Sequence, residues 1–151
     1  MEFLTSDQVI IFLELLLAAC LGAIIGLERE CQRKEAGLRT YTLVSLGSAL
    51  FVIIGREAFF GLTGNAGISF DPSRVVAALI MGVGFIGAGT IIHRETRIEG
   101  LTTAAGLWLV AAIGGAVGGR FYLPAIFTAL LSLLILTGLR QVEEKFLNKE
   151  K

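Results

Sequence analysis

The chain has 151 residues, of which 54% are hydrophobic and 17% charged, and its mean hydropathy of +0.76 excludes an ordinary soluble domain. The 13 basic and 13 acidic residues balance, and no basic run indicates a surface for nucleic acid. This composition is typical of an integral membrane protein.

Five apolar segments approach the length of about 20 residues that a helix needs to cross a bilayer. They run from Val9 to Leu27, Leu38 to Phe59, Arg74 to Ile92, Leu101 to Gly118 and Phe121 to Leu139. The sequence therefore predicts an all-α fold, a polytopic transmembrane helical bundle of five spans. Residues 1–139 make up this domain, and residues 140–151 make up a short, charged, helical tail.

Basic residues lie mostly on one side of the predicted bundle. The loops after spans one and three, together with the tail, hold ten of them, and only Arg56, Arg74 and Arg120 lie on the other side. Because cytoplasmic loops are enriched in Lys and Arg, we expect the N-terminus outside and the C-terminus inside the cell.

Span one places Glu14, Ala18, Gly22, Gly26 and Glu30 at successive intervals of four residues, on one ridge of a helix. The small residues in its middle indicate a face for close helix packing. A carboxylate at Glu14 costs up to about 3 kcal/mol if it lies near the bilayer centre. A helix shifted outward by one turn would make it interfacial, and the sequence leaves both positions open.

The first inner loop brings the acids Glu28 and Glu30 to the membrane edge beside Arg29. Acids are not needed for membrane orientation, so an ion pair and a cation site are both open interpretations. Arg39 and Thr40, at the start of span two, are further candidates for a polar site.

Span three begins with a helix-start signal, in which Asp71 can cap free amides and the following proline fits the first turn. Asp71 and Arg74 are three residues apart, so they share a face at the outer entrance of this span, where they could also gate or bind. The capping role and the binding role are both open at this point.

Four glycines, Gly82, Gly84, Gly87 and Gly89, lie in the middle of span three. Each costs about 1 kcal/mol of helix propensity relative to Ala, which indicates that something approaches this backbone closely. Close packing on the ridge of span one is favoured. The alternative is a locally opened helix whose carbonyls face an ion.

Glu99 precedes span four, which begins with Leu101, Thr102 and Thr103. This start resembles that of span two and predicts a parallel repeat of two-helix units, with chance similarity among apolar helices as the alternative. Trp108 falls near the middle of span four, so we expect it to pack against small residues of a neighbouring helix.

Several motifs occur together in a fixed order along the chain. They are Leu21-Gly22 with Glu28-Arg29-Glu30, Ala36-Gly37-Leu38-Arg39-Thr40, Asp71-Pro72-Ser73-Arg74, Gly84-Phe85-Ile86-Gly87-Ala88-Gly89 and Gly100-Leu101-Thr102-Thr103-Ala104-Ala105. In this combination the chain resembles the membrane domain of the MgtC/SapB family over nearly its whole length from span one to span four.

The resemblance implies a multi-pass protein of the bacterial inner membrane, linked to magnesium homeostasis and to growth when magnesium is scarce. It does not by itself imply transport. MgtC-type members carry a C-terminal soluble domain after the last span, which has no counterpart in this sequence, so functions resting on that domain are not expected here.

Two classes of function follow. In the first, the chain binds or transports Mg²⁺, an ion that prefers oxygen ligands and one or two carboxylates. The candidates are the acids Glu14, Glu28, Glu30, Asp71 and Glu99, with Thr40, Thr102 and Thr103 as neutral oxygens and with Glu30 and Asp71 as the assigned metal ligands.

In the second class, the chain is a regulatory membrane protein that docks through small-residue helix faces on another membrane protein or on copies of itself as a homo-oligomer. An enzyme is not expected, because the single histidine, His93, has no nucleophile that the sequence places beside it.

Overall fold

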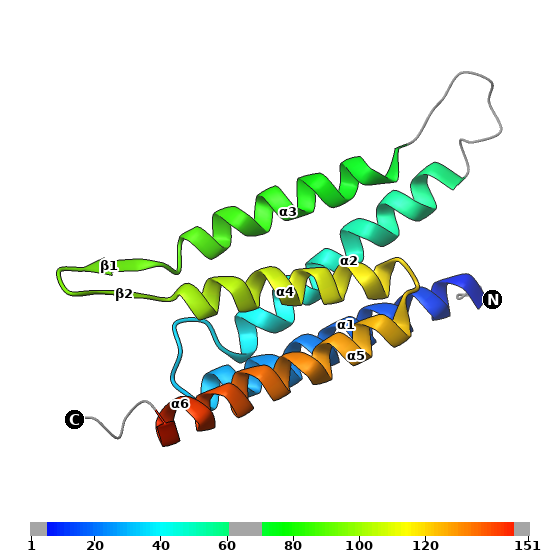
Figure 1. The fold of residues 1–151 in the computed structure, drawn as a ribbon. Helices are drawn as coiled ribbons and strands as arrows, with labels where there is room; N and C mark the ends of the chain where they lie inside the picture. The colour runs from blue at the N-terminus through cyan, green and yellow to red at the C-terminus, as the bar shows by residue number, and fades with distance from the viewer. Residues whose placement is uncertain (1–5, 61–70, 147–151) are drawn as a thin grey trace.

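The computed structural model describes residues 6–60 and 71–146, which form a bundle of long helices and one β-hairpin (Figure 1). The long helices are α1 (Ser6–Cys31), α2 (Leu38–Phe60), α3 (Pro72–Ala88), α4 (Leu101–Gly118) and α5 (Tyr122–Leu134). A π-helical segment, η1 (Ile135–Leu139), and α6 (Arg140–Phe146) continue directly from α5. The predicted all-α bundle is therefore confirmed, and the last five residues of the predicted tail lie outside the described part.

Four of these helices are long and apolar enough to cross a membrane, over Ser6–Cys31, Leu38–Glu57, Leu101–Gly118 and Tyr122–Val142, and Ser73–Ala88 is a shorter apolar helix. Large apolar side chains on their outer surfaces, including Phe12, Phe51 and Phe127, are more than half exposed. Such a surface is unfavourable in water and suited to lipid. The chain is therefore a multi-pass membrane protein.

Helix α4 lies at the centre of the bundle and contacts each of the other four long helices. Its side chains Leu107, Val110, Ile113 and Val117 are buried. They pack with buried residues of α1, α2 and α5, among them Ala18, Leu21, Ile25, Tyr41, Ala49, Ala125 and Ala129. Helix α3 contributes no residue to this core within the described chain.

Close backbone contact through glycine occurs on both sides of α2. On α1, a Cβ added to Gly22 would lie 2.7 Å from Ser45 Cβ, and one added to Gly26 would lie 2.8 Å from Leu38 Cα. On α4, a Cβ at Gly114 or Gly118 would overlap backbone carbonyls of α2. Because real Cβ atoms do not approach so closely, only glycine allows these helices to meet.

The ridge of Ala18, Gly22 and Gly26 thus packs closely, but the prediction that it packs on the glycines of α3 is wrong. Helix α2 occupies the ridge, and the Ser45 hydroxyl donates to the Ala18 carbonyl at 2.7 Å. The physical reason is the short loop between α1 and α2, which makes these helices antiparallel neighbours and leaves no room for α3.

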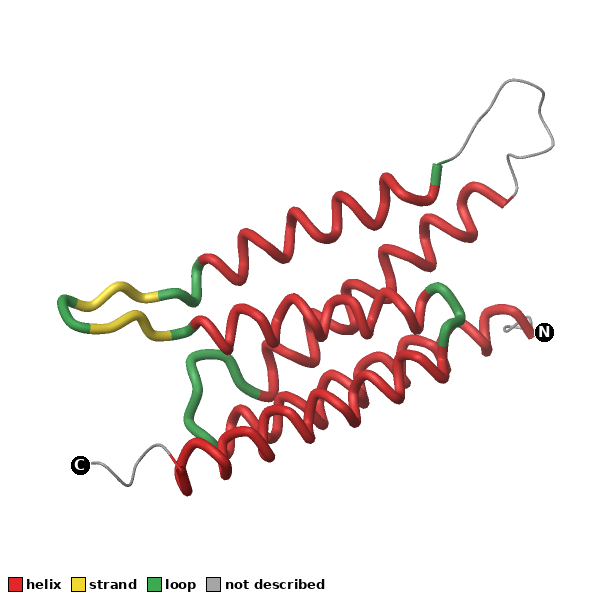
Figure 2. The backbone as a smooth tube through the Cα atoms, viewed as in Figure 1, coloured by secondary structure: helices red, strands yellow, loops and turns green. Residues whose placement is uncertain are grey.

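The connection between α3 and α4 also differs from the prediction. Helix α3 ends at Ala88, and a hairpin of β1 (Ile92–Arg94) and β2 (Arg97–Glu99) follows, with Ile92 opposite Glu99 and Arg94 opposite Arg97 (Figure 2). β-Branched residues such as Ile92 and Ile98 favour strands. Gly100 then turns the chain into α4 with φ of 87°, a conformation that glycine adopts easily.

Helix α3 lies at the edge of the bundle (Figure 1), with its larger contact on α4 and a smaller one on α2. An added Cβ at Gly82 or Gly84 would meet nothing within 4 Å, so the predicted close packing is wrong for these two within the described chain. Gly87 does lie against Ala104, at 3.5 Å for an added Cβ. Trp108 is 49% exposed on α4 and is not buried among glycines.

Candidate functional site

A buried carboxylate in α1 gathers donors from three other parts of the chain. Glu14 is 2% exposed and accepts from Arg56 (Nη2 to Oε2, 2.9 Å), Arg120 (Nε to Oε1, 3.1 Å) and Tyr122 (Oη to Oε1, 2.6 Å). Arg56 is at the end of α2, Arg120 lies in the turn between α4 and α5, and Tyr122 begins α5. We call these four residues the Glu14 cluster.

The donors of the Glu14 cluster have further partners that fix their positions. Arg56 also donates to the Gly118 carbonyl at 2.7 Å and pairs with Glu57 at 2.9 Å. Arg120 has a left-handed backbone, with φ of 66°. Non-glycine residues rarely adopt this conformation, and it costs of the order of 1 kcal/mol or more. The turn is therefore held in place by contacts such as the pair of Arg120 with Glu14.

Chemically, the Glu14 cluster is an ion-paired joint between helices. A buried carboxylate is very unfavourable alone, and charge-assisted hydrogen bonds from two guanidinium groups and a phenol offset that penalty. Both carboxylate oxygens of Glu14 already accept hydrogen bonds from these groups.

The opposite end of α1 carries a second group of acids, and its members have different partners. Arg29, 3% exposed, pairs through Nε with Glu28 Oε2. Glu30 Oε2 accepts from the Leu38 amide at 3.1 Å and so caps the start of α2. Of the two interpretations of this loop, the ion pair is the one found for Glu28, although its Oε1 atom is buried without a partner among the described residues.

Glu35, in the loop before α2, reaches α4 from this end. Its Oε2 accepts from the Thr103 hydroxyl at 2.6 Å, and this hydrogen bond holds the pKa of the Glu35 carboxyl below its usual value. Thr103 is buried, and its carbonyl accepts from the Tyr41 hydroxyl at 3.3 Å. Thr103 is therefore a structural link between α2, α4 and the first loop.

The remaining predicted residues do not converge. Asp71 Oδ1 accepts from the Ser73 amide at 2.9 Å, which confirms the cap of α3. Hydrogen bonding from the Ser73 side chain, and then from its amide, lowers the pKa of Asp71. Glu99 pairs with Arg94 and Arg97 in the hairpin. Arg39, Arg74 and Thr102 are exposed, Thr40 is partly buried, and His93 is exposed in β1.

The two predicted metal ligands, Glu30 and Asp71, do not lie together. Glu30 is at the end of α1 and Asp71 precedes α3, and these two helix ends lie at opposite ends of the bundle (Figure 1). Across residues 6–60 and 71–146, no three His, Cys, Asp or Glu side chains are grouped so that they could hold a metal ion.

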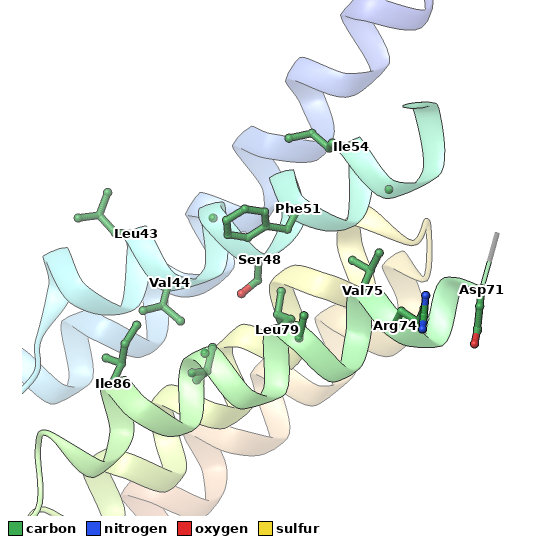
Figure 3. A pocket seen from close by; sticks show the side chains of 15 residues that line it. Leu43, Val44, Ser48, Phe51, Ile54, Asp71, Arg74, Val75, Leu79 and Ile86 are labelled. Carbon is green, nitrogen blue, oxygen red and sulfur yellow. The ribbon is translucent and has the colours of Figure 1, made fainter. Parts of the chain in front are cut away.

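An apolar cleft of about 940 Å³ lies between α2 and α3 (Figure 3). We call it the α2–α3 cleft. Its walls are mainly apolar, with Asp71 and Arg74 at the end where α3 begins. The lining side chains include Leu43, Val44, Phe51, Ile54, Val75, Leu79 and Ile86, and the backbones of Gly47 and Gly82 also line it.

Five polar-site residues could not be predicted from the sequence alone: Arg56, Arg120, Tyr122, Glu35 and Tyr41. Arg56 and Arg120 were expected only to set the orientation in the membrane. A signal was present, because a carboxylate inside an apolar helix needs a cationic partner. Only three basic residues lie on the predicted outer side, so the two that pair with Glu14 were among few candidates.

Comparison with known proteins identifies the family, since a sequence model of the MgtC family matches residues 15–145. The chain belongs to the MgtC family. It is 42% identical over 137 residues to the "Putative magnesium transporter YhiD" of Escherichia coli strain K12, covering 91% of this chain and 64% of that protein.

Two further relatives agree. "Protein SapB" of Bacillus subtilis strain 168 is 41% identical over 126 residues, covering 83% of this chain and 54% of SapB. "Protein MgtC" of Salmonella typhimurium strain LT2 is 41% identical over 110 residues, covering 72% of this chain and 44% of MgtC. The chain thus spans 44% to 64% of the length of these three MgtC-family relatives. No solved structure matches it.

Proposed function

We propose that this chain acts in magnesium homeostasis, and that it does so by docking on other membrane helices and not by carrying Mg²⁺. The link to magnesium is supported by the family and by the name of the relative YhiD. The docking mechanism is carried by one observation: the buried Glu14 and the partly buried Glu28 are both paired with arginines.

The electrostatics of these pairs oppose Mg²⁺ binding. Two unit charges 4 Å apart interact by about 4 kcal/mol at an effective dielectric constant of 20, so a divalent ion is repelled by about 8 kcal/mol by each guanidinium at that distance. At Glu14 two guanidinium groups oppose one carboxylate. Mg²⁺ also keeps most of its waters and prefers carboxylates that are free to coordinate it.

Helix α3 offers a surface for docking. Met81 is 70% exposed and Phe85 83% exposed, and Gly84 and Ala88 are exposed beside them. We call these four residues the α3 outer face. Gly84 and Ala88 are four residues apart, so they form the small-residue pair through which membrane helices approach closely. The partner is a helix of another copy of this chain or of a different membrane protein.

The test combines transport and assembly. In vesicles that enclose a Mg²⁺-sensitive dye, we expect the purified protein to give no more flux than protein-free vesicles. A detergent-stable complex, measured by light scattering after extraction, should be lost in Gly84→Leu and retained in Glu30→Gln. Gly87→Leu is unsuitable, because Gly87 packs on Ala104 within the chain. Protein-dependent Mg²⁺ flux, or an intact complex in Gly84→Leu, would overturn the proposal.

A second candidate function is Mg²⁺ binding at the inner end of α1. It is favoured by Glu28 Oε1, which is buried and has no partner among the described residues. If this atom is a ligand, Mg²⁺ should raise the melting temperature of the purified protein, and Glu28→Gln should remove that increase while Glu57→Gln preserves it. An equal increase in all three proteins would exclude Glu28 as a ligand.

A further inference from the structure

The α2–α3 cleft has the size and the lining of a binding site. Its volume of about 940 Å³ is at the upper end of the range of about 300–1,000 Å³ that is usual for small-molecule sites. Two glycines create the space, one on each wall. An added Cβ at Gly47 of α2 or Gly82 of α3 would meet nothing within 4 Å.

The cleft is accessible from the perimeter of the bundle. Phe51 and Leu43 on the α2 wall are 63% and 66% exposed, and Ile86 on the α3 wall is 44% exposed. Helix α3 is also the helix at the edge of the bundle (Figure 1). In a membrane this perimeter contacts lipid, so the molecules that reach the cleft most readily are lipids with hydrocarbon chains.

One end of the cleft is charged, which selects among lipids. Asp71 and Arg74 line the end where α3 begins, and both side chains are exposed (Figure 3). No ion pair within 4.0 Å joins these two described residues to each other. A guanidinium and a carboxylate less than one helical turn apart are complementary to a headgroup that carries a phosphate and a primary ammonium.

We propose that the α2–α3 cleft binds one phosphatidylethanolamine molecule, with an acyl chain between α2 and α3, its phosphate at Arg74 and its ammonium group at Asp71. The site is independent of any role in magnesium homeostasis. It also differs from the α3 outer face, since Gly82 lines the cleft and Gly84 does not.

Native mass spectrometry of the detergent-purified chain, with equal amounts of dioleoyl phosphatidylethanolamine and dioleoyl phosphatidylglycerol, tests this directly. We expect one retained phospholipid per chain, with phosphatidylethanolamine preferred about threefold to fivefold, as for one exposed charge pair. Retention of neither lipid by the wild-type chain would overturn the proposal.

A matched pair of variants localises the site. Gly82→Leu adds a bulky side chain to the α3 wall of the cleft, and Gly84→Leu makes the same change two residues away, also into open space. Both should fold, and only Gly82→Leu should lose the lipid. Gly47→Leu adds the same bulk to the α2 wall and should also lose the lipid, which provides a second variant if Gly82→Leu is poorly folded.

Headgroup variants separate the charges. Asp71→Asn keeps a capping residue at the start of α3 and should retain lipid, but without the preference for phosphatidylethanolamine. Arg74→Gln should weaken retention of both lipids. Equal retention in wild type, Gly82→Leu and Gly47→Leu would overturn the proposal. So would a loss of the detergent-stable complex without a loss of lipid in these variants, since a second copy would then be the occupant.

Failure of the lipid proposal is distinguishable from failure of the proposed function. Gly84→Leu should lose the protein complex and keep the lipid, whereas Gly82→Leu should lose the lipid and keep the complex. Each variant is therefore the control for the other.

Discussion

In the α1–α2–α4 part of the bundle, glycines lie against the backbone of a neighbouring helix, whereas in α3 two of them face open space. Gly22, Gly26, Gly114 and Gly118 leave no room for a Cβ atom beside α2. Gly82 and Gly84 carry the same local signal in the sequence, but a Cβ added to either would meet nothing within 4 Å among the described residues. A glycine-rich span therefore indicates where a close approach is allowed, and the partner has to be found separately.

The difference extends to polar contacts. The α1–α2–α4 part, which we call the packed part, is joined at one end by the Glu14 cluster. Along its length, the hydrogen bond from the Ser45 hydroxyl to the Ala18 carbonyl joins α2 to α1. Helix α3 contributes one buried apolar side chain, Val83, among the described residues. We therefore assign stability to the packed part, and binding to the cleft and the outer face of α3.

The largest expected difference comes from adding one methyl group to a glycine that lies against α2 and, for comparison, to a glycine of α3 that faces open space. Gly114→Ala should strongly destabilise the protein, because its Cβ would overlap the Ser45 carbonyl, and overpacking costs about 1–3 kcal/mol or more. Gly84→Ala should be neutral or stabilising by up to about 1 kcal/mol through helix propensity. Thermal unfolding in detergent measures both, and equal melting temperatures would remove the distinction between the two regions.

Loss of the carboxylate in the Glu14 cluster should have the next largest effect. Glu14→Gln leaves Arg56 and Arg120 without their anion and should cost about 1–3 kcal/mol, the usual range for a partly buried polar group that loses its partner. The matched control is Glu57→Gln, whose exposed pair with Arg56 should contribute only about 0–1 kcal/mol. A stable Glu14→Gln protein would show that the cluster is not a joint between helices.

A smaller effect is expected for Ser45→Ala. This change removes the hydrogen bond to the Ala18 carbonyl, which joins α1 to α2, and should cost about 0.5–1.5 kcal/mol. Thr137→Ala is a suitable control, because its hydroxyl donates to the Leu133 carbonyl one turn earlier in the same helical segment, on the exposed surface. Similar melting temperatures of the two variants would contradict a specific role for the α1–α2 contact.

The smallest expected effect is a pH dependence at the other end of the packed part. The Thr103 hydroxyl lowers the pKa of Glu35 in the folded protein, so this contribution is fully present above the unfolded pKa of about 4.3 and is lost as pH falls through the folded pKa. The melting temperature of Thr103→Val should therefore differ from wild type at pH 6, and the difference should shrink at pH 3.5. A difference that is constant with pH would rule out Glu35 as its source.

Much of the architecture follows from the sequence alone. Long apolar segments in lipid must satisfy their backbone hydrogen bonds internally, so the all-α class and the approximate spans could be predicted. The cap at Asp71, the packing face of Ala18, Gly22 and Gly26, and the family were also predicted, because capping, helical periodicity and ordered motifs are local properties. The outward N-terminus and the internal repeat stay predictions.

Only the tertiary structure decided which residues meet. The partners of Glu14 lie 42, 106 and 108 residues away, and helical periodicity carries no information on contacts at such separations. The same limit applies to the occupation of the α1 ridge by α2, to the hairpin that shortens α3, and to the cleft beside Gly82. Local chemistry determined the helices and their small-residue faces, whereas packing between distant segments determined which faces were covered and which stayed open.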